Sequence, residues 1–139
     1  MPRIERTAQV AWEGNVARGN GSMTAGSGAF TELPYSLPAR IGSVAGKTSP
    51  EELLAAAHAG CLTMGIATEL TQAGTPPERL EVACRVVMDE VEGQGHQIVA
   101  SHVTVPRELA DDLVERADAG CPFSIMLRNA GVEVTINRA

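Results

Sequence analysis

Three cysteines, Cys61, Cys84 and Cys121, are the residues of this chain most open to redox or nucleophilic chemistry. No two of them stand at the short spacing of a zinc-ligand pair, and only three histidines accompany them, so a metal site is not expected. An odd number of cysteines also argues against a framework of structural disulfides. The sequence therefore raises the question of which single thiol reacts.

Cys121 precedes a proline at the start of a short predicted helix. Free backbone N–H groups at a helix N-terminus favour a thiolate, so the position suits a reactive thiol, although a capping role without chemistry also explains it. Cys84 falls on the apolar face of a predicted strand, where a cysteine is expected to act as a small core residue.

Cys61 lies in the middle of an apolar predicted helix, where burial raises the pKa of a thiol and makes it unreactive. A reactive Cys61 therefore needs a positive group from another segment, and Arg40 is the candidate. His58 precedes Cys61 by one helical turn and could share its face. A Cys61–His58 pair would suit a hydrolase or acyl transferase, whereas a histidine on an alanine-rich helix is more often a packing residue.

The clearest predicted element is a helix that begins at Ser49 and runs to Leu70. A serine N-cap, a first-turn proline and Glu52 form a capping box, which accounts for Glu52 but does not require Glu51. Between residues 53 and 67 the helix is apolar on nearly all sides. Such a helix must be buried all round, either by a sheet wrapped around it or by dimerisation.

The other elements are shorter. Strands are predicted at residues 7–12, 15–18 and 22–25, with a hairpin turn at 19–21, followed by an irregular segment at 26–46. Further strands are predicted at 80–91, 97–105 and 131–137, and helices at 106–119 and 122–127. This order indicates one domain, residues 1–139, of the α+β class with a largely antiparallel sheet.

The composition of the chain limits the kinds of binding partner that we expect. The net charge is −6, no basic cluster is present and aromatic residues make up 3%, so nucleic-acid binding is not expected. No apolar run matches the length of a membrane span, and the N-terminus lacks the apolar core of a signal peptide. We therefore expect a cytoplasmic protein that does not associate with membranes.

The chain resembles the OsmC/Ohr family of osmotically inducible and organic hydroperoxide resistance proteins, and its OsmC branch in particular. The matching segments are Trp12-Glu13-Gly14, Arg18-Gly19-Asn20-Gly21, Pro34-Tyr35, Arg40, Ser49-Pro50-Glu51-Glu52-Leu53, Ala57-His58-Ala59-Gly60-Cys61 and Gly120-Cys121-Pro122. The order and spacing of these segments are more specific for the family than any single segment. One departure is Ala45-Gly46-Lys47-Thr48, where the family usually has Gly-Thr-Asn-Pro.

The resemblance implies an OsmC-like fold, with antiparallel sheets wrapped around a buried central helix in an intertwined homodimer. It also implies a peroxidase without a bound cofactor. The Cys61 thiolate would attack an organic hydroperoxide, Cys121 would condense with the resulting sulfenic acid, and an external dithiol or lipoylated protein would reopen the disulfide. Arg40 would hold the thiolate and Glu51 would orient Arg40, with Arg18 as the alternative arginine.

Two questions stay open at this point. Ten residues of straight helix, about 15 Å, separate Glu51 from Cys61, so the two cannot contact one peroxide oxygen from the same helix. Either the arginine segment bridges them, or Glu51 serves the Cys61 of a partner chain. A non-enzymatic thiol redox sensor on the same fold is the alternative function.

Overall fold

The computed structural model describes residues 2–139, which fall into two compact units. The first unit extends to Pro50 and the second comprises Glu51–Ala139. Each unit is described by itself below.

The first unit is built on a small antiparallel sheet. Its strands are β1 (Ala8–Glu13), β2 (Asn20–Ala25) and β3 (Leu33–Tyr35), in the order β1-β2-β3. A five-residue helix, α1 (Leu37–Ile41), follows within the segment predicted to be irregular. The helix forms because the Ser36 hydroxyl accepts a hydrogen bond from the Ala39 N–H at 3.3 Å, and a proline stands in its first turn.

Two predictions about the first hairpin are wrong. Residues 15–18 form the turn and not a strand, because the Asn15 side chain accepts the Arg18 N–H at 2.8 Å and its carbonyl accepts the Gly19 N–H at 2.7 Å. Residues 20 and 21 belong to β2. A glycine is needed at Gly21 because any side chain there would collide with the rings of Trp12 and Tyr35. The Gly-Asn-Gly sequence therefore allows two aromatic rings to pack closely against the backbone, and it does not form a turn.

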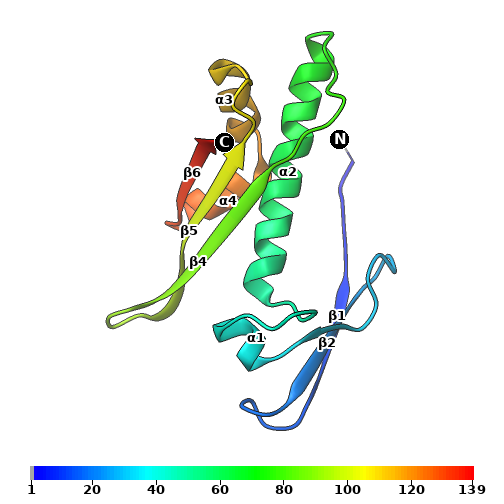
Figure 1. Ribbon diagram of the computed structural model, residues 1–139, viewed down its shortest axis with the longest axis vertical. Coiled ribbons are helices and arrows are strands. Elements are labelled where there is room, and N and C mark those ends of the chain that lie inside the picture. Colours follow the sequence, from blue (N-terminus) through cyan, green and yellow to red (C-terminus); the bar gives the residue numbers. More distant parts are fainter. Residues whose placement is uncertain (1) are drawn as a thin grey trace. The chain divides into compact units, whose positions relative to one another are not determined.

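The second unit begins with the long helix α2 (Pro50–Gln72), which confirms the predicted helix at residues 49–70. It is followed by β4 (Ala83–Val91), β5 (Gly95–Val105), α3 (Asp111–Ala119), α4 (Pro122–Asn129) and β6 (Glu133–Arg138). In Figure 1, β4 and β5 form a long antiparallel hairpin and β6 lies along β5. Helix α3 begins five residues later than predicted, because residues 106–110 form a turn and Ala110 has an extended backbone.

Strand β6 pairs with β5 in the parallel direction, whereas every other strand pair is antiparallel. The chain reaches β6 through the two helices α3 and α4, and a crossover of this kind is what a parallel pair requires. The expectation of largely antiparallel sheets therefore holds, with this one exception.

The core of the second unit lies between α2, β5 and α3. Its buried members are Leu62, Ile66, Val103, Val105, Leu113, Val114, Ala117 and Cys121. Burying such side chains is the main favourable contribution to folding, at about 1.5–3 kcal/mol for each large one. Cys121 is thus part of the hydrophobic core, and Cys61 packs against it.

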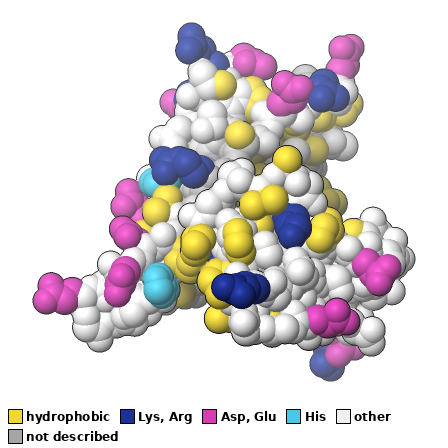
Figure 2. All heavy atoms as spheres, turned by 60° about the horizontal axis from the view of Figure 1, so that its bottom comes forward, with side chains coloured by type: hydrophobic (Ala, Val, Ile, Leu, Met, Phe, Trp, Pro, Cys, Tyr) yellow, Lys and Arg dark blue, Asp and Glu magenta, His cyan; other side chains and the backbone are white. Residues whose placement is uncertain are grey.

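Helix α2 buries one stripe of its surface within the chain. His58, Leu62 and Ile66, spaced four residues apart, are fully buried, whereas Met64 is 74% exposed. By length and composition α2 could also cross a membrane, with a mean hydropathy of 1.3, which corrects the expectation that no apolar run is that long. Core helices of soluble proteins meet the same criterion. Other hydrophobic side chains also lie open at the surface among charged ones (Figure 2).

Candidate functional site

The structure places the side chains of Cys61 and Cys121 close together in one core. Cys61 stands in the middle of α2, and Cys121 is the N-cap residue of α4. Cys61 packs against the core cluster that contains Cys121, the Cys121 side chain raises the pKa of the Cys61 thiol, and both cysteines are free. Residues 60 positions apart in the sequence are thus side by side in the core of the second unit.

Backbone hydrogen bonds fix Cys121 between two helices. Its N–H donates to the Asp118 carbonyl at the end of α3 at 3.1 Å, and its carbonyl accepts the Ile125 N–H of α4 at 3.0 Å. Pro122 at the first position of α4 suits a helix start because it has no N–H to satisfy. The Cys-Pro step therefore sets where the thiol stands.

The environment within the second unit does not ionise Cys61. Burial raises the pKa of the Cys61 thiol, and the neighbouring Cys121 side chain raises it further. The backbone N–H of Phe123, in the first turn of α4, acts in the opposite direction. Among residues 2–139, no basic side chain is a cause of this pKa shift. A thiolate at Cys61 therefore requires a positive charge that the surrounding residues of this unit do not supply.

His58 is completely buried and bonded on both ring nitrogens. Its Nδ1 lies 2.7 Å from the Ser101 hydroxyl of β5, and its Nε2 lies 2.8 Å from the Ser124 hydroxyl of α4. Burial lowers the pKa of His58; the Asp118 carboxylate opposes this shift and the Arg128 guanidinium adds to it. The ring is thus neutral and held by two serines, an arrangement that leaves neither nitrogen to activate Cys61.

Cys84 belongs to the same network of polar groups as His58. Its sulfur lies 3.3 Å from the Ser101 hydroxyl, and the residue is half-buried against the core. The sequence did not single out Ser101 or Ser124. Ser101 shares its face of β5 with Val103 and Val105, and a polar residue in such a row is a sign of a buried hydrogen bond.

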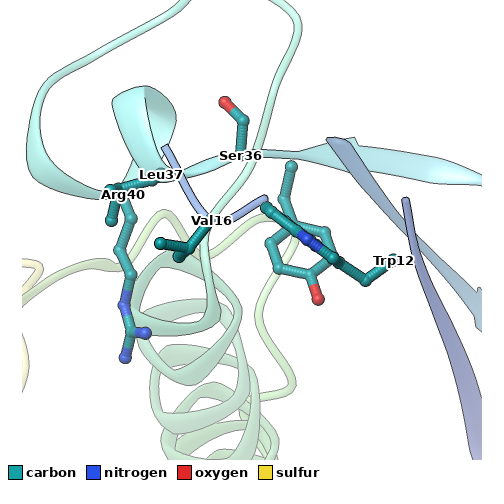
Figure 3. Close-up of a pocket in the computed structure, with 6 residues that line it drawn as sticks. Trp12, Val16, Ser36, Leu37 and Arg40 are labelled. Atoms are coloured by element: carbon teal, nitrogen blue, oxygen red, sulfur yellow. The ribbon is translucent and has the colours of Figure 1, made fainter. Parts of the chain in front are cut away.

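Arg40 lines a pocket within the first unit. The cavity has a volume of about 330 Å³ and is lined by Trp12, Val16, Tyr35, Ser36, Leu37 and Arg40. In the view of Figure 3, Arg40 and Trp12 lie on opposite sides of it and Val16 lies between them. The rings of Trp12 and Tyr35 are in tilted contact with centroids 5.6 Å apart. The pocket therefore combines an apolar, aromatic lining with one guanidinium group.

The other predicted site residues lie in separate places. Glu51 is in the first turn of α2, in the second unit, and the helix is continuous from there to Cys61. Arg18 belongs to the exposed turn before β2 and is not among the residues that line the pocket of Arg40. Among residues 2–139, no group of three or more histidine, cysteine, aspartate or glutamate side chains is arranged to hold a metal ion.

The chain is similar to known proteins over nearly its whole length. Peroxiredoxin OsmC of Escherichia coli and its counterpart in Shigella flexneri are each 34% identical over 141 residues, covering 96% of this chain and 95% of theirs. Among solved structures, OhrB of Bacillus subtilis matches with a TM-score of 0.70 at 25% identity, covering 96% of this chain and 98% of its own.

A second solved structure, the organic hydroperoxide resistance protein OsmC of Legionella pneumophila, matches with a TM-score of 0.72 at 22% identity and covers 99% of both chains. These likenesses confirm the predicted α+β fold of the OsmC type. The OsmC-like protein family itself matches residues 43–137, which include α2 with Cys61 and the N-cap Cys121. The chain therefore belongs to the OsmC-like family.

Proposed function

We propose that the protein is a thiol-dependent peroxidase that reduces organic hydroperoxides to alcohols, as part of a cytoplasmic response to oxidative stress. The observation that carries the proposal is the shared packing of Cys61 and Cys121 in the core of the second unit. The names of the relatives, peroxiredoxin and organic hydroperoxide resistance protein, support the same chemistry.

The proposed reaction begins at Cys61, the more accessible thiol of the pair. Its thiolate attacks the distal peroxide oxygen, so that an S–O bond forms as the O–O bond breaks. The alkoxide takes up a proton and leaves as an alcohol, and Cys61 becomes a sulfenic acid. The Cys121 sulfur then displaces the sulfenic hydroxyl, which leaves as water, and a Cys61–Cys121 disulfide results.

Arg40 is proposed to supply the positive charge that Cys61 needs. A cation near a thiol lowers its pKa and offsets burial, and none of the groups that shift Cys61 within its own unit is a cation. The pocket around Arg40 offers an apolar surface for the organic part of a hydroperoxide, next to a group that attracts the peroxide oxygens. Glu51 is proposed to orient Arg40, and Arg18 stays a secondary candidate.

A second copy of this chain is the partner that we propose for the exposed apolar surfaces. Along α2, the residues on the exposed stripe include Ala56, Gly60 and Met64, which are small or apolar. Val10 of β1 is 58% exposed as well. Small residues permit close helix approach, and an intertwined homodimer would bury these surfaces.

The disulfide is proposed to be reopened by an external dithiol, such as a lipoylated protein, and not by a bound cofactor. Thiol–disulfide exchange moves both electrons from the dithiol to the protein and leaves the reductant as a disulfide. Neither a nucleic acid nor a membrane has a part in this scheme.

Steady-state reduction of cumene hydroperoxide with dihydrolipoamide or dithiothreitol tests the proposal. We expect turnover by the native protein and by Cys84→Ser, and its loss by a factor of at least about 1,000 in Cys61→Ser, because Cys61 is the thiol that we propose to form the sulfenic acid. Mass spectrometry after one equivalent of peroxide should find Cys61 joined to Cys121 and Cys84 free.

Two results would contradict the proposal. Full turnover by Cys61→Ser would remove Cys61 from the reaction. Oxidation of the native protein without repeated turnover in excess dithiol would favour a thiol redox sensor instead.

A further inference from the structure

Three contacts place α2 against α3 and α4 in one antiparallel register. A side-chain atom added at Gly65 would meet the Cβ of Ala117 at 3.6 Å, Cys61 packs against the cluster that contains Cys121, and His58 is bonded to Ser124. Along α2 these contacts move back by four residues and then by three. Along the segment from α3 to α4, their partners move forward by the same four and three residues. His58–Ser124 is therefore the contact one helical turn beyond the cysteine pair.

The Ser124 contact is a polar link between α4 and α2. The side chain of the α4 N-cap residue makes no capping hydrogen bond, so the first turn of this helix lacks the usual anchor. Ser124 stands in that turn, is fully buried, and meets His58 Nε2 at 2.8 Å. A buried hydrogen bond of this kind is costly to break because it leaves buried polar atoms unsatisfied.

The other side of the His58 ring is fixed as well. Its Nδ1 meets Ser101 of β5 at 2.7 Å, so the imidazole cannot turn about its bond to the helix without losing a second hydrogen bond. A neutral imidazole has one donor and one acceptor nitrogen, and a serine hydroxyl can serve either. The ring thus acts as a rigid spacer between the sheet, α2 and the first turn of α4.

This spacer bears on sulfur chemistry because a disulfide tolerates little misplacement. The S–S bond is about 2 Å long and needs a dihedral angle near 90°, so both Cβ positions must be held closely. The same turn of α4 carries Phe123, whose backbone N–H acts on the Cys61 thiol. A shift of this turn would move both Cys121 and that N–H away from Cys61.

We propose that His58 is a positioning residue that acts through Ser124. It holds the first turn of α4 in the register in which the Cys121 sulfur reaches the Cys61 sulfur, and so promotes the formation of their disulfide. The inference deepens the proposed function, since it concerns the second step of the same reaction. It does not depend on the peroxidase activity, because disulfide formation can be measured without a peroxide.

The test compares Ser124→Ala with Ser101→Ala in glutathione redox buffers. Both changes remove one buried hydroxyl from His58, and only the first detaches α4. Oxidised glutathione exchanges with the dithiol to give the Cys61–Cys121 disulfide and two glutathione thiols, and the equilibrium yields the effective concentration of one cysteine at the other. We expect a fall of about tenfold in Ser124→Ala and less than about twofold in Ser101→Ala.

A pair of substitutions at His58 itself separates positioning from folding. The amide of an asparagine side chain overlies the Nδ1 position and that of glutamine the Nε2 position, so His58→Gln retains a partner for Ser124 and His58→Asn does not. We expect His58→Gln to keep an effective concentration near the native value and His58→Asn to match Ser124→Ala. This pair of variants also tests the positioning role if Ser124→Ala does not fold.

In excess cumene hydroperoxide, the same variants should differ in the fate of Cys61. A slower condensation leaves the sulfenic acid exposed to a second peroxide, so Ser124→Ala should accumulate more Cys61 sulfinic acid than Ser101→Ala. Equal effects of the two serine changes, or a native effective concentration in Ser124→Ala, would overturn the inference. Failure of the native protein to consume peroxide, with the redox-buffer difference intact, would refute only the proposed function.

Discussion

The two units of the chain differ in how much of themselves they bury. In the first unit every residue of β1 is exposed, and six of the nine exposed large hydrophobic side chains found among the described residues belong to it. In the second unit lies the whole of the hydrophobic core cluster, with Cys121 among its members. The thiol pair is thus built into the well-packed unit, and Arg40 into the lightly packed one.

This difference in packing matches two different requirements of the proposed reaction. Two sulfurs that must join need a fixed geometry, which a close-packed core provides. The cation that we propose for ionising Cys61 needs no such fixed geometry, and segments with few buried contacts move more easily. Each prediction below tests whether the two units divide the work in this way, beginning with the largest expected effect.

Removal of the Arg40 guanidinium should impair catalysis without unfolding the protein. We expect Arg40→Ala to lower kcat/KM by about 100-fold, because a single preorganised electrostatic contact is worth about that much. The pH at which activity rises should move upward, since burial raises the pKa of Cys61 when no cation opposes it. Arg40→Lys should restore part of the loss, and Arg18→Ala should behave as the native protein. The reverse order of Arg40 and Arg18 would transfer the role to Arg18.

Stability should depend on the second unit. Leu62→Ala empties a fully buried site and is expected to lower the free energy of unfolding by about 3 kcal/mol. Val10→Ala, in the exposed strand β1, should change it by less than about 0.5 kcal/mol in the isolated chain. Urea titrations followed by circular dichroism measure both. A large loss in Val10→Ala at high protein concentration only would indicate that β1 is buried in a dimer.

The pocket of the first unit should affect the choice of substrate. Trp12→Ala removes the largest aromatic surface from its lining and is expected to raise the KM for cumene hydroperoxide by about tenfold. Hydrogen peroxide has no organic group to bind there, so its rate constant should stay unchanged and serves as the control. Equal effects on the two peroxides would show that the pocket does not hold the organic group.

The smallest expected effect is on the pH dependence of stability. Burial lowers the pKa of His58, with Asp118 opposing and Arg128 adding to the shift, so the unfolded chain binds a proton near its ordinary pKa of about 6.5 that the folded chain does not. The free energy of unfolding should therefore fall as the pH decreases below about 6.5. In His58→Gln this decrease should be shallower. An identical slope in the two proteins would mean that His58 does not contribute to it.

Much of the fold could be predicted from local patterns. The capping box at residues 49–52 located α2 to within a few residues, and the Cys-Pro step located the start of α4. The first hairpin was misread because glycine serves two purposes. At Gly21 it makes room for two aromatic rings from elsewhere in the chain, and a local pattern contains no information about such a contact.

The candidate site was less predictable than the fold. Cys61 alone has the sequence context of a core residue, and only family resemblance paired it with Cys121. The bond of His58 to two serines could not be foreseen, since those serines are 43 and 66 residues away. Spacing along one helix placed His58 near Cys61, but the partners of its ring depend on the packing of other segments.

The unequal burial of the two cysteines also bears on the direction of electron flow. Cys121 is 2% exposed, and Cys61 is half-buried. In the proposed reaction, an incoming dithiol would reach the Cys61 sulfur of the disulfide, and Cys121 would depart as the leaving group at the N-terminus of α4, which favours an anion. Oxidant and reductant would then meet the same atom in turn. Such an order permits a single entrance for two chemically opposite reagents and leaves the second sulfur closed to foreign thiols.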